Sequence, residues 1–157
     1  MNNSMNLPIE VRSFLASIQN MVKNPGVIEY NPLFIYGGGG KANFMQAIGN
    51  ELHEKNPHLV ICRVTTEALL NEYAEILKNR QIASFRKKYR SVDVLMIDDI
   101  HLLQNNMPFQ EEFFNTFNAL RGMNKQIVVT SNEAPQNLPL IAERLVARLA
   151  SGMVMEI

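Results

Sequence analysis

The chain has 157 residues, and its 15 basic and 15 acidic side chains cancel to a formal net charge of zero. This length suits one domain with a sizeable core, and a neutral chain has no overall field that would draw it to nucleic acid or to an acidic membrane. The single cysteine excludes a disulfide framework. There is no signal-peptide pattern and no apolar run of the ~20 residues that a membrane span needs. We therefore expect one cytoplasmic domain over residues 1–157, with residues 1–6 flexible.

Strand and helix signals alternate along the chain. Short apolar runs predict five strands, at residues 33–36, 59–64, 92–97, 126–131 and 153–157. Apolar residues at helical spacing predict helices at residues 8–23, 41–55, 66–77, 81–88, 110–120 and 140–149. Within the helix at 110–120, the side chains expected to face the core are Phe113, Phe114 and Phe117. This alternation predicts an α/β fold with three layers and a mostly parallel five-stranded sheet.

A glycine-rich segment follows the first predicted strand. It consists of Gly37, Gly38, Gly39, Gly40 and Lys41. Glycines let backbone N–H groups turn toward an anion, and the helix that follows adds the positive end of its dipole, so the segment predicts a phosphate-binding loop. The nucleoside-triphosphate form, G-x-x-x-x-G-K-[ST], would have a glycine at position 35 and a magnesium-binding hydroxyl at position 42. This chain has Ile35 and Ala42 there.

Polar side chains follow two other predicted strands. Asp98 and Asp99 come after the strand at 92–97, and Asn132 comes after the strand at 126–131. Ligands of parallel sheets gather outside the carboxyl ends of the strands. We therefore expect Asp98 to orient magnesium, Asp99 to polarise an attacking water, and Asn132 to contact a terminal phosphate. With the glycine loop, the acid pair indicates P-loop ancestry; the alternative is two solvated carboxylates that cap the next helix.

Six longer segments carry a resemblance to a known family. They are YNPLFIYGG at 30–38, MQAIGN at 45–50, YRSVDVLMIDDI at 89–100, QEEFFNTFN at 110–118, KQIVVTS at 125–131 and ERLVAR at 143–148. These segments resemble the ATPase domain of DnaA, the bacterial chromosomal replication initiator, and the similarity extends over about residues 14–157. The resemblance implies an AAA+ core of the P-loop NTPase class. In that family such cores bind ATP between neighbouring subunits and assemble into filaments that open origin DNA.

The chain departs from this family in the glycine loop. The family has Gly-Gly-x-Gly-x-Gly-Lys-Thr, whereas this chain, aligned on Lys41, lacks two residues and has Ala42 in place of the threonine. Two missing residues shorten the loop by up to ~7 Å of chain. The lost hydroxyl removes a ligand of Mg²⁺, which tolerates poor geometry badly. We therefore expect ATP and Mg²⁺ to bind weakly at best, and we expect no effective ATP hydrolysis.

Other parts of the family are also absent or altered. Residues 1–10 do not resemble the adenine-contacting segment, and the stretch at 104–108 has none of the basic residues that the family uses for single-stranded DNA. The helical lid and the helix-turn-helix domain would follow residue 157. We therefore expect neither of them here, and no recognition of a duplex DNA sequence by this chain alone.

Several basic side chains keep a candidate role. The resemblance matches Arg148 to the family's arginine finger, which reaches the γ-phosphate of a neighbouring subunit and can act in trans. The alternative is a surface arginine near a helix C-terminus, and Arg144 either assists Arg148 or pairs with an acid. A basic run comprises Arg80, Arg86, Lys87, Lys88 and Arg90. We favour a solvated helix face over a phosphate contact for this run, and we expect His53, His58 and His101 to be surface or capping residues.

Taken together, these features predict a DnaA-like replication-initiation module with a degenerate nucleotide site that acts by protein–protein contact. Its partner would be a DnaA-family initiator or another replication protein, with self-association left open. Two alternatives remain: a weak ATP-binding switch that uses Lys41 and Asp98, and an inactive truncated relic. Residues 1–6 contain no convincing peptide for binding a polymerase clamp.

Overall fold

The computed structural model describes residues 14–157, and its centre is a five-stranded sheet in which every strand pairing is parallel. The strands are β1 (Leu33–Tyr36), β2 (Ile61–Thr65), β3 (Val94–Asp98), β4 (Gln126–Ser131) and β5 (Met153–Glu156). Their order across the sheet is β2-β3-β4-β1-β5. The predicted five-stranded α/β fold is therefore confirmed, with β2 and β5 at its edges.

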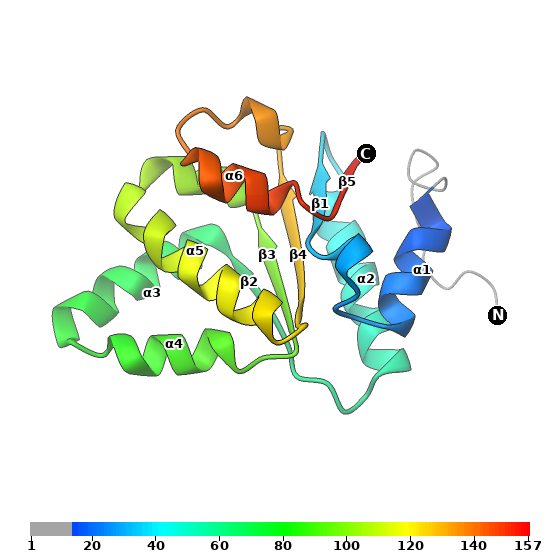
Figure 1. Cartoon of the computed structure of the whole chain (residues 1–157), viewed down its shortest axis with the longest axis horizontal. Coiled ribbons are helices and arrows are strands. Elements are labelled where there is room, and N and C mark those ends of the chain that lie inside the picture. Colours follow the sequence, from blue (N-terminus) through cyan, green and yellow to red (C-terminus); the bar gives the residue numbers. More distant parts are fainter. Residues whose placement is uncertain (1–13) are drawn as a thin grey trace.

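Helices cover both faces of this sheet (Figure 1). On one face lie α1 (Leu15–Lys23) and α2 (Lys41–Lys55). On the other lie α3 (Thr66–Asn79), α4 (Ile82–Arg90), α5 (Met107–Gly122) and α6 (Glu143–Leu149). Within residues 14–157, none of these helices is both long enough and apolar enough to cross a bilayer. The three predicted layers are thus present.

Alternate strand residues supply the two halves of the core. Val94 and Met96 of β3 join the buried cluster beneath α1 and α2, whereas Leu95 and Ile97 join the cluster beneath the other helices. Successive side chains of a strand point to opposite faces of the sheet. It follows that Asp98, two residues beyond Met96, lies on the face covered by α2.

Several boundaries differ from those predicted. The α5 helix begins at Met107, not at residue 110, because the Asn106 side chain accepts a hydrogen bond from the Phe109 N–H at 2.9 Å and caps the helix. The α6 helix begins at Glu143, not at residue 140. Short 3₁₀ helices occupy Ile100–Asn105 and Pro135–Asn137, where the sequence predicts loops. Residues 8–13 of the first predicted helix lie outside the described residues.

Candidate functional site

The loop at residues 37–40 joins β1 to α2 at the carboxyl end of the sheet. Gly37 has a φ of 137°, and a Cβ added there would lie 2.2 Å from the carbonyl oxygen of Ile157, so a side chain would collide with the backbone just beyond β5. Gly40 has a φ of 91° and forms the N-cap of α2. Added Cβ atoms at Gly38 and Gly39 would meet nothing within 4 Å. The loop is therefore anchored at its two ends and open to solvent between them.

Lys41 begins α2, and its ammonium group is bound to the loop that precedes it. The Nζ atom donates hydrogen bonds to the carbonyl oxygens of Gly37 at 2.7 Å and of Gly38 at 2.6 Å. A lysine ammonium has three donors and no acceptor. Two of the three donors of Lys41 are thus committed to its own loop.

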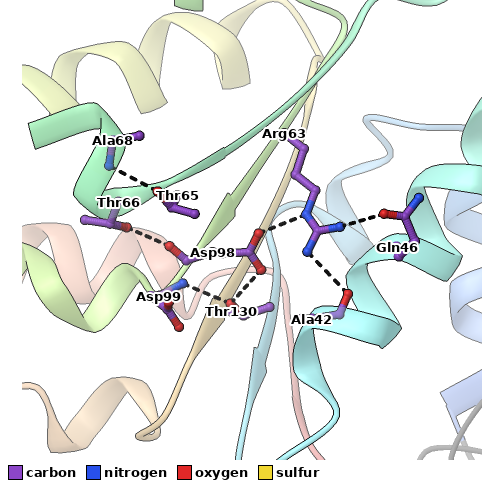
Figure 2. Close-up of polar contacts among 9 residues, drawn as sticks. All are labelled: Ala42, Gln46, Arg63, Thr65, Thr66, Ala68, Asp98, Asp99 and Thr130. Carbon is purple, nitrogen blue, oxygen red and sulfur yellow. Dashed lines mark hydrogen bonds and ion pairs between the residues drawn. The ribbon is translucent and has the colours of Figure 1, made fainter. Parts of the chain in front are cut away.

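Asp98 ends β3 and is held from three sides (Figure 2). Its Oδ2 atom accepts a hydrogen bond from Arg63 Nε at 2.9 Å, which is also an ion pair. Its Oδ1 atom lies 3.4 Å from the Thr130 hydroxyl, and its main-chain oxygen accepts a hydrogen bond from the Thr66 hydroxyl at 2.9 Å. Contacts from β2 and β4 therefore hold the carboxylate, the contact from α3 holds the main chain beside it, and the residue is only 8% exposed.

Arg63 is a residue of this site that the sequence alone did not single out. Ile61 of β2 packs against the cluster beneath α2, and Arg63 follows two residues later on the same face. Besides Asp98, its guanidinium reaches Gln46 Oε1 at 3.2 Å and the main-chain oxygen of Ala42 at 3.3 Å, both on α2 (Figure 2). An arginine that alternates with apolar residues in a strand is the signal that could have revealed it, because such a charge needs an acidic partner.

Asp99 differs from Asp98 in its backbone conformation. It has a left-handed conformation, with φ 62° and ψ 49°, and starts the 3₁₀ helix at Ile100–Asn105. Its main-chain N–H donates a hydrogen bond to the Thr130 hydroxyl at 3.0 Å. The same threonine therefore contacts both aspartates, and the predicted activation of a water by Asp99 stays a prediction.

His101 also lies at the carboxyl end of the strands, where the sequence predicts a surface or capping residue. Its Nδ1 atom accepts a hydrogen bond from the main-chain N–H of Asn132 at 3.1 Å, whereas the Asn132 side chain is exposed. Burial lowers the pKa of His101 below its ordinary value of 6.5; Lys41 adds to this effect, and Asp99 and Glu133 oppose it. His101 is therefore neutral at pH 7, as its acceptor role requires.

The depressed pKa of His101 predicts a loss of stability in weak acid. At pH values between the pKa of His101 in the folded protein and its unfolded value of 6.5, the unfolded chain binds more protons than the folded one. The free energy of unfolding therefore rises with pH in that window, and it decreases as the pH falls through it. The variant His101→Asn keeps an acceptor for the Asn132 N–H but cannot titrate. In urea unfolding at several pH values between 7 and 5, it should lose less stability than the wild type does. The exposed His53→Asn serves as control; parallel curves for His101→Asn and the wild type would contradict the assignment.

Arg148 lies on α6, and its side chain contacts α5. Neither its hydrogen bond to Asn118 nor its contact with the Phe114 ring involves the glycine loop or the two aspartates. The guanidinium groups of Arg144 and Arg148 lie 4.4 Å and 5.7 Å from the centre of the Phe114 ring. Arg144 also pairs with Glu111, and Arg148 Nε donates a hydrogen bond to Asn118 Oδ1 at 3.2 Å. Both arginines are exposed. Their charged groups are therefore available to a partner although their positions are restrained.

Phe114 was predicted to face the core, and it does so only in part. Phe113 and Phe117 are 2% and 0% exposed, as expected of core residues. Phe114 is only partly buried: it packs against the edge of the core cluster on this face of the sheet, and the two arginine side chains lie over its ring. Phe114 thus supports the arginines at the surface.

Most of the basic run on α4 is engaged in ion pairs. Arg86 and Arg90 both bind the carboxylate of Glu112, each with a 2.9 Å contact, and the Glu112 side chain is only 4% exposed. Lys88 pairs with Glu72 at 3.1 Å. These contacts dock α4 on α5 and α3, so a solvated face describes only part of the run. The remaining members of the run, Arg80 and Lys87, are exposed.

The parallel sheet ordered β2-β3-β4-β1-β5, the glycine–lysine loop after β1 and the paired aspartates at the end of β3 define a P-loop NTPase core of the AAA+ class. The family described as the bacterial DnaA ATPase domain matches residues 11–156. The chain belongs to this family.

Individual relatives agree with this assignment. The chain is 45% identical over 146 residues to the chromosomal replication initiator protein DnaA of Methylacidiphilum infernorum, which covers 92% of this chain and 32% of that protein. It thus spans about a third of the length of the curated relatives it matches. The crystal structure of domain III of DnaA from Thermotoga maritima has a TM-score of 0.89 and 37% identity, over 96% of this chain and 63% of that one. The replication initiator DnaA bound to AMPPCP and single-stranded DNA has a TM-score of 0.88 and 35% identity, over 96% of this chain and 47% of that one.

Proposed function

We propose that this chain is a DnaA-type replication-initiation module with a degenerate nucleotide site, which acts by binding another replication protein. The degenerate site is supported by the way its charged groups are already engaged. Lys41 is bound to two carbonyl oxygens of its own loop, Asp98 is paired with Arg63, and Ala42 has a methyl group in place of a hydroxyl. Mg²⁺ demands a near-ideal octahedron of oxygen ligands. The side chains at this site, already paired in this way, do not offer Mg²⁺ such a set of ligands.

The observation that carries the protein-contact function is the arginine face, which we define as Phe114, Arg144 and Arg148. Stacking on Phe114 and the bond to Asn118 restrain Arg148 while leaving it exposed. A side chain that is already ordered loses less entropy when it binds. A guanidinium is suited to phosphate oxygens, which it can bind through two parallel hydrogen bonds. We propose that the arginine face docks on the nucleotide site of a complete DnaA, where Arg148 reaches the terminal phosphate of the bound ATP.

A binding titration tests this docking. The labelled chain is titrated with full-length DnaA of the same cell, loaded with ATP or with ADP, and fluorescence anisotropy is followed. We expect tighter binding to the ATP form, and a loss of about tenfold in affinity for that form in Arg148→Ala, equivalent to ~1.4 kcal/mol. Lys87→Ala is the matched control, because it removes one exposed positive charge from α4 and leaves the arginine face intact.

Other results of this titration would reject the docking surface or favour one of the two alternative functions. Equal binding by the wild type and Arg148→Ala would reject the arginine face as the docking surface. Binding by neither would favour an inactive relic. The similarity to a DnaA bound to AMPPCP keeps a weak ATP-binding switch as the second candidate. Micromolar, Mg²⁺-dependent ATP binding by this chain alone, lost in Lys41→Ala, would support that candidate instead.

A further inference from the structure

The carboxylate of Asp98 is an ionised group that lies almost entirely away from water. Its side chain is 12% exposed, and a charge so placed needs a partner of opposite sign. Arg63 supplies that partner at 2.9 Å, and its side chain is itself 31% exposed. An arginine stays protonated at every pH at which proteins fold. The positive charge beside Asp98 is therefore built into the chain and does not depend on the concentration of any ion.

The hydrogen bonds of Arg63 hold its guanidinium between the sheet and α2. Three of its N–H groups are directed to three acceptors: Asp98 Oδ2, Gln46 Oε1 and the main-chain oxygen of Ala42 (Figure 2). A cation that approached Oδ2 would have to displace a group held at all three points. Such a displacement would also leave the guanidinium without its acidic partner.

The second carboxylate oxygen of Asp98 also faces a donor. The Thr130 oxygen accepts a hydrogen bond from the Asp99 N–H, so its own hydroxyl proton is free to point to Asp98 Oδ1, 3.4 Å away. Both carboxylate oxygens are thus directed at protein donors. Ala42 offers no hydroxyl, and its main-chain oxygen is bound to Arg63. Both carboxylate oxygens of Asp98 and the main-chain oxygen of Ala42 are therefore already paired with the protein.

We propose that Arg63 takes the place of a divalent cation as the counter-ion of Asp98, so that this domain neither binds Mg²⁺ at Asp98 nor responds to it. This inference rests on the proposed degenerate site and names the residue that keeps the metal out. The missing hydroxyl at position 42 and the arginine at position 63 then act in the same direction. One removes a metal ligand, and the other supplies the charge that the metal would have brought.

Manganese binding tests the proposal, with the Mn²⁺ electron paramagnetic resonance signal as the measure of free ion. The wild type is expected to show no saturable binding at millimolar Mn²⁺, and Asp98→Asn should not differ from it. Arg63→Gln removes the charge and frees Asp98, so it should gain saturable binding that is half complete at least tenfold below the highest Mn²⁺ concentration at which the wild type stays unbound. The double variant Arg63→Gln/Asp98→Asn should lose this gain. Urea unfolding of each variant shows which of them are folded.

Saturable Mn²⁺ binding by the wild type that disappears in Asp98→Asn would overturn the proposal. So would a folded Arg63→Gln that binds no more Mn²⁺ than the wild type. If Arg63→Gln does not fold, Arg63→Lys decides: a lysine keeps a positive charge beside Asp98, so Mn²⁺ should still be excluded, and saturable Mn²⁺ binding that disappears in Arg63→Lys/Asp98→Asn would overturn the proposal. The docking titration with Arg148→Ala requires no metal on this chain, so failure of one idea is distinguishable from failure of the other.

Discussion

Replacement of Glu112 by alanine is expected to lower the free energy of unfolding by about 3 kcal/mol. The carboxylate of Glu112 is 4% exposed and binds two arginines of α4, Arg86 through both its oxygens at 2.9–3.2 Å and Arg90 at 2.9 Å. Removal of one partner from a buried ion pair leaves an uncompensated charge. Breaking a buried ion pair usually costs about 3–5 kcal/mol of stability. We expect a loss at the low end of this range because the side chains of Arg86 and Arg90 are 46% and 26% exposed and can be hydrated in part.

Urea unfolding checks this value, and the chain offers a matched control on the same helix. Glu111→Ala also removes one glutamate from α5 and breaks an ion pair, with Arg144, but both of these side chains are more than half exposed. Exposed pairs contribute at most about 1 kcal/mol. Equal losses in Glu111→Ala and Glu112→Ala would contradict the view that the buried carboxylate holds α4 against α5.

The second large effect is expected for Phe117→Ala, which should lower the free energy of unfolding by about 3–5 kcal/mol. The Phe117 ring is 0% exposed and meets the Phe113 ring edge to face, with 6.3 Å between the centres. Its truncation leaves a cavity between α5 and the sheet that the rigid surroundings cannot fill. Thermal or chemical unfolding, followed by circular dichroism, measures the loss.

Phe114→Ala separates stability from docking. The ring of Phe114 is only partly buried, so its removal should cost less than half as much stability as Phe117→Ala. It should nevertheless weaken docking, because Arg144 and Arg148 lose the ring on which they lie. Equal destabilisation by the two substitutions would mean that Phe114 contributes as much to the core as Phe117 does.

The elements whose bounds were predicted correctly have strong local signals. The strands at 33–36 and 126–131 and the helix at 41–55 have the predicted limits, because proline, glycine or lysine borders a dense apolar pattern there. The predicted start of α6 at residue 140 was wrong because Ile141 has helical spacing with Leu145 and Leu149 but reaches the core from the loop before the helix. Apolar spacing records burial and not the backbone conformation that achieves it.

The residues of the candidate site divide in the same way. The order of strands and glycines along the chain was sufficient to predict that the loop at 37–41, Asp98, Asp99 and Asn132 lie at the same end of a parallel sheet. The reason is that ligands of such sheets bind at the carboxyl ends of the strands. Family resemblance added Arg148. The roles assigned to these residues in binding and catalysis stay predictions.

Sequence by itself determined the fold class, the family and the edge of the sheet where chemistry would occur, because periodicity and turn residues are local properties of the chain. Only the tertiary structure decided which charges meet there. Arg63 reaches Asp98 because the parallel register of β2 and β3 brings them to the same face, and His101 reaches the Asn132 backbone across the ends of β3 and β4. A charged side chain is stabilised by whatever opposite charge or dipole lies within a few ångströms, and separation along the sequence says nothing about that distance.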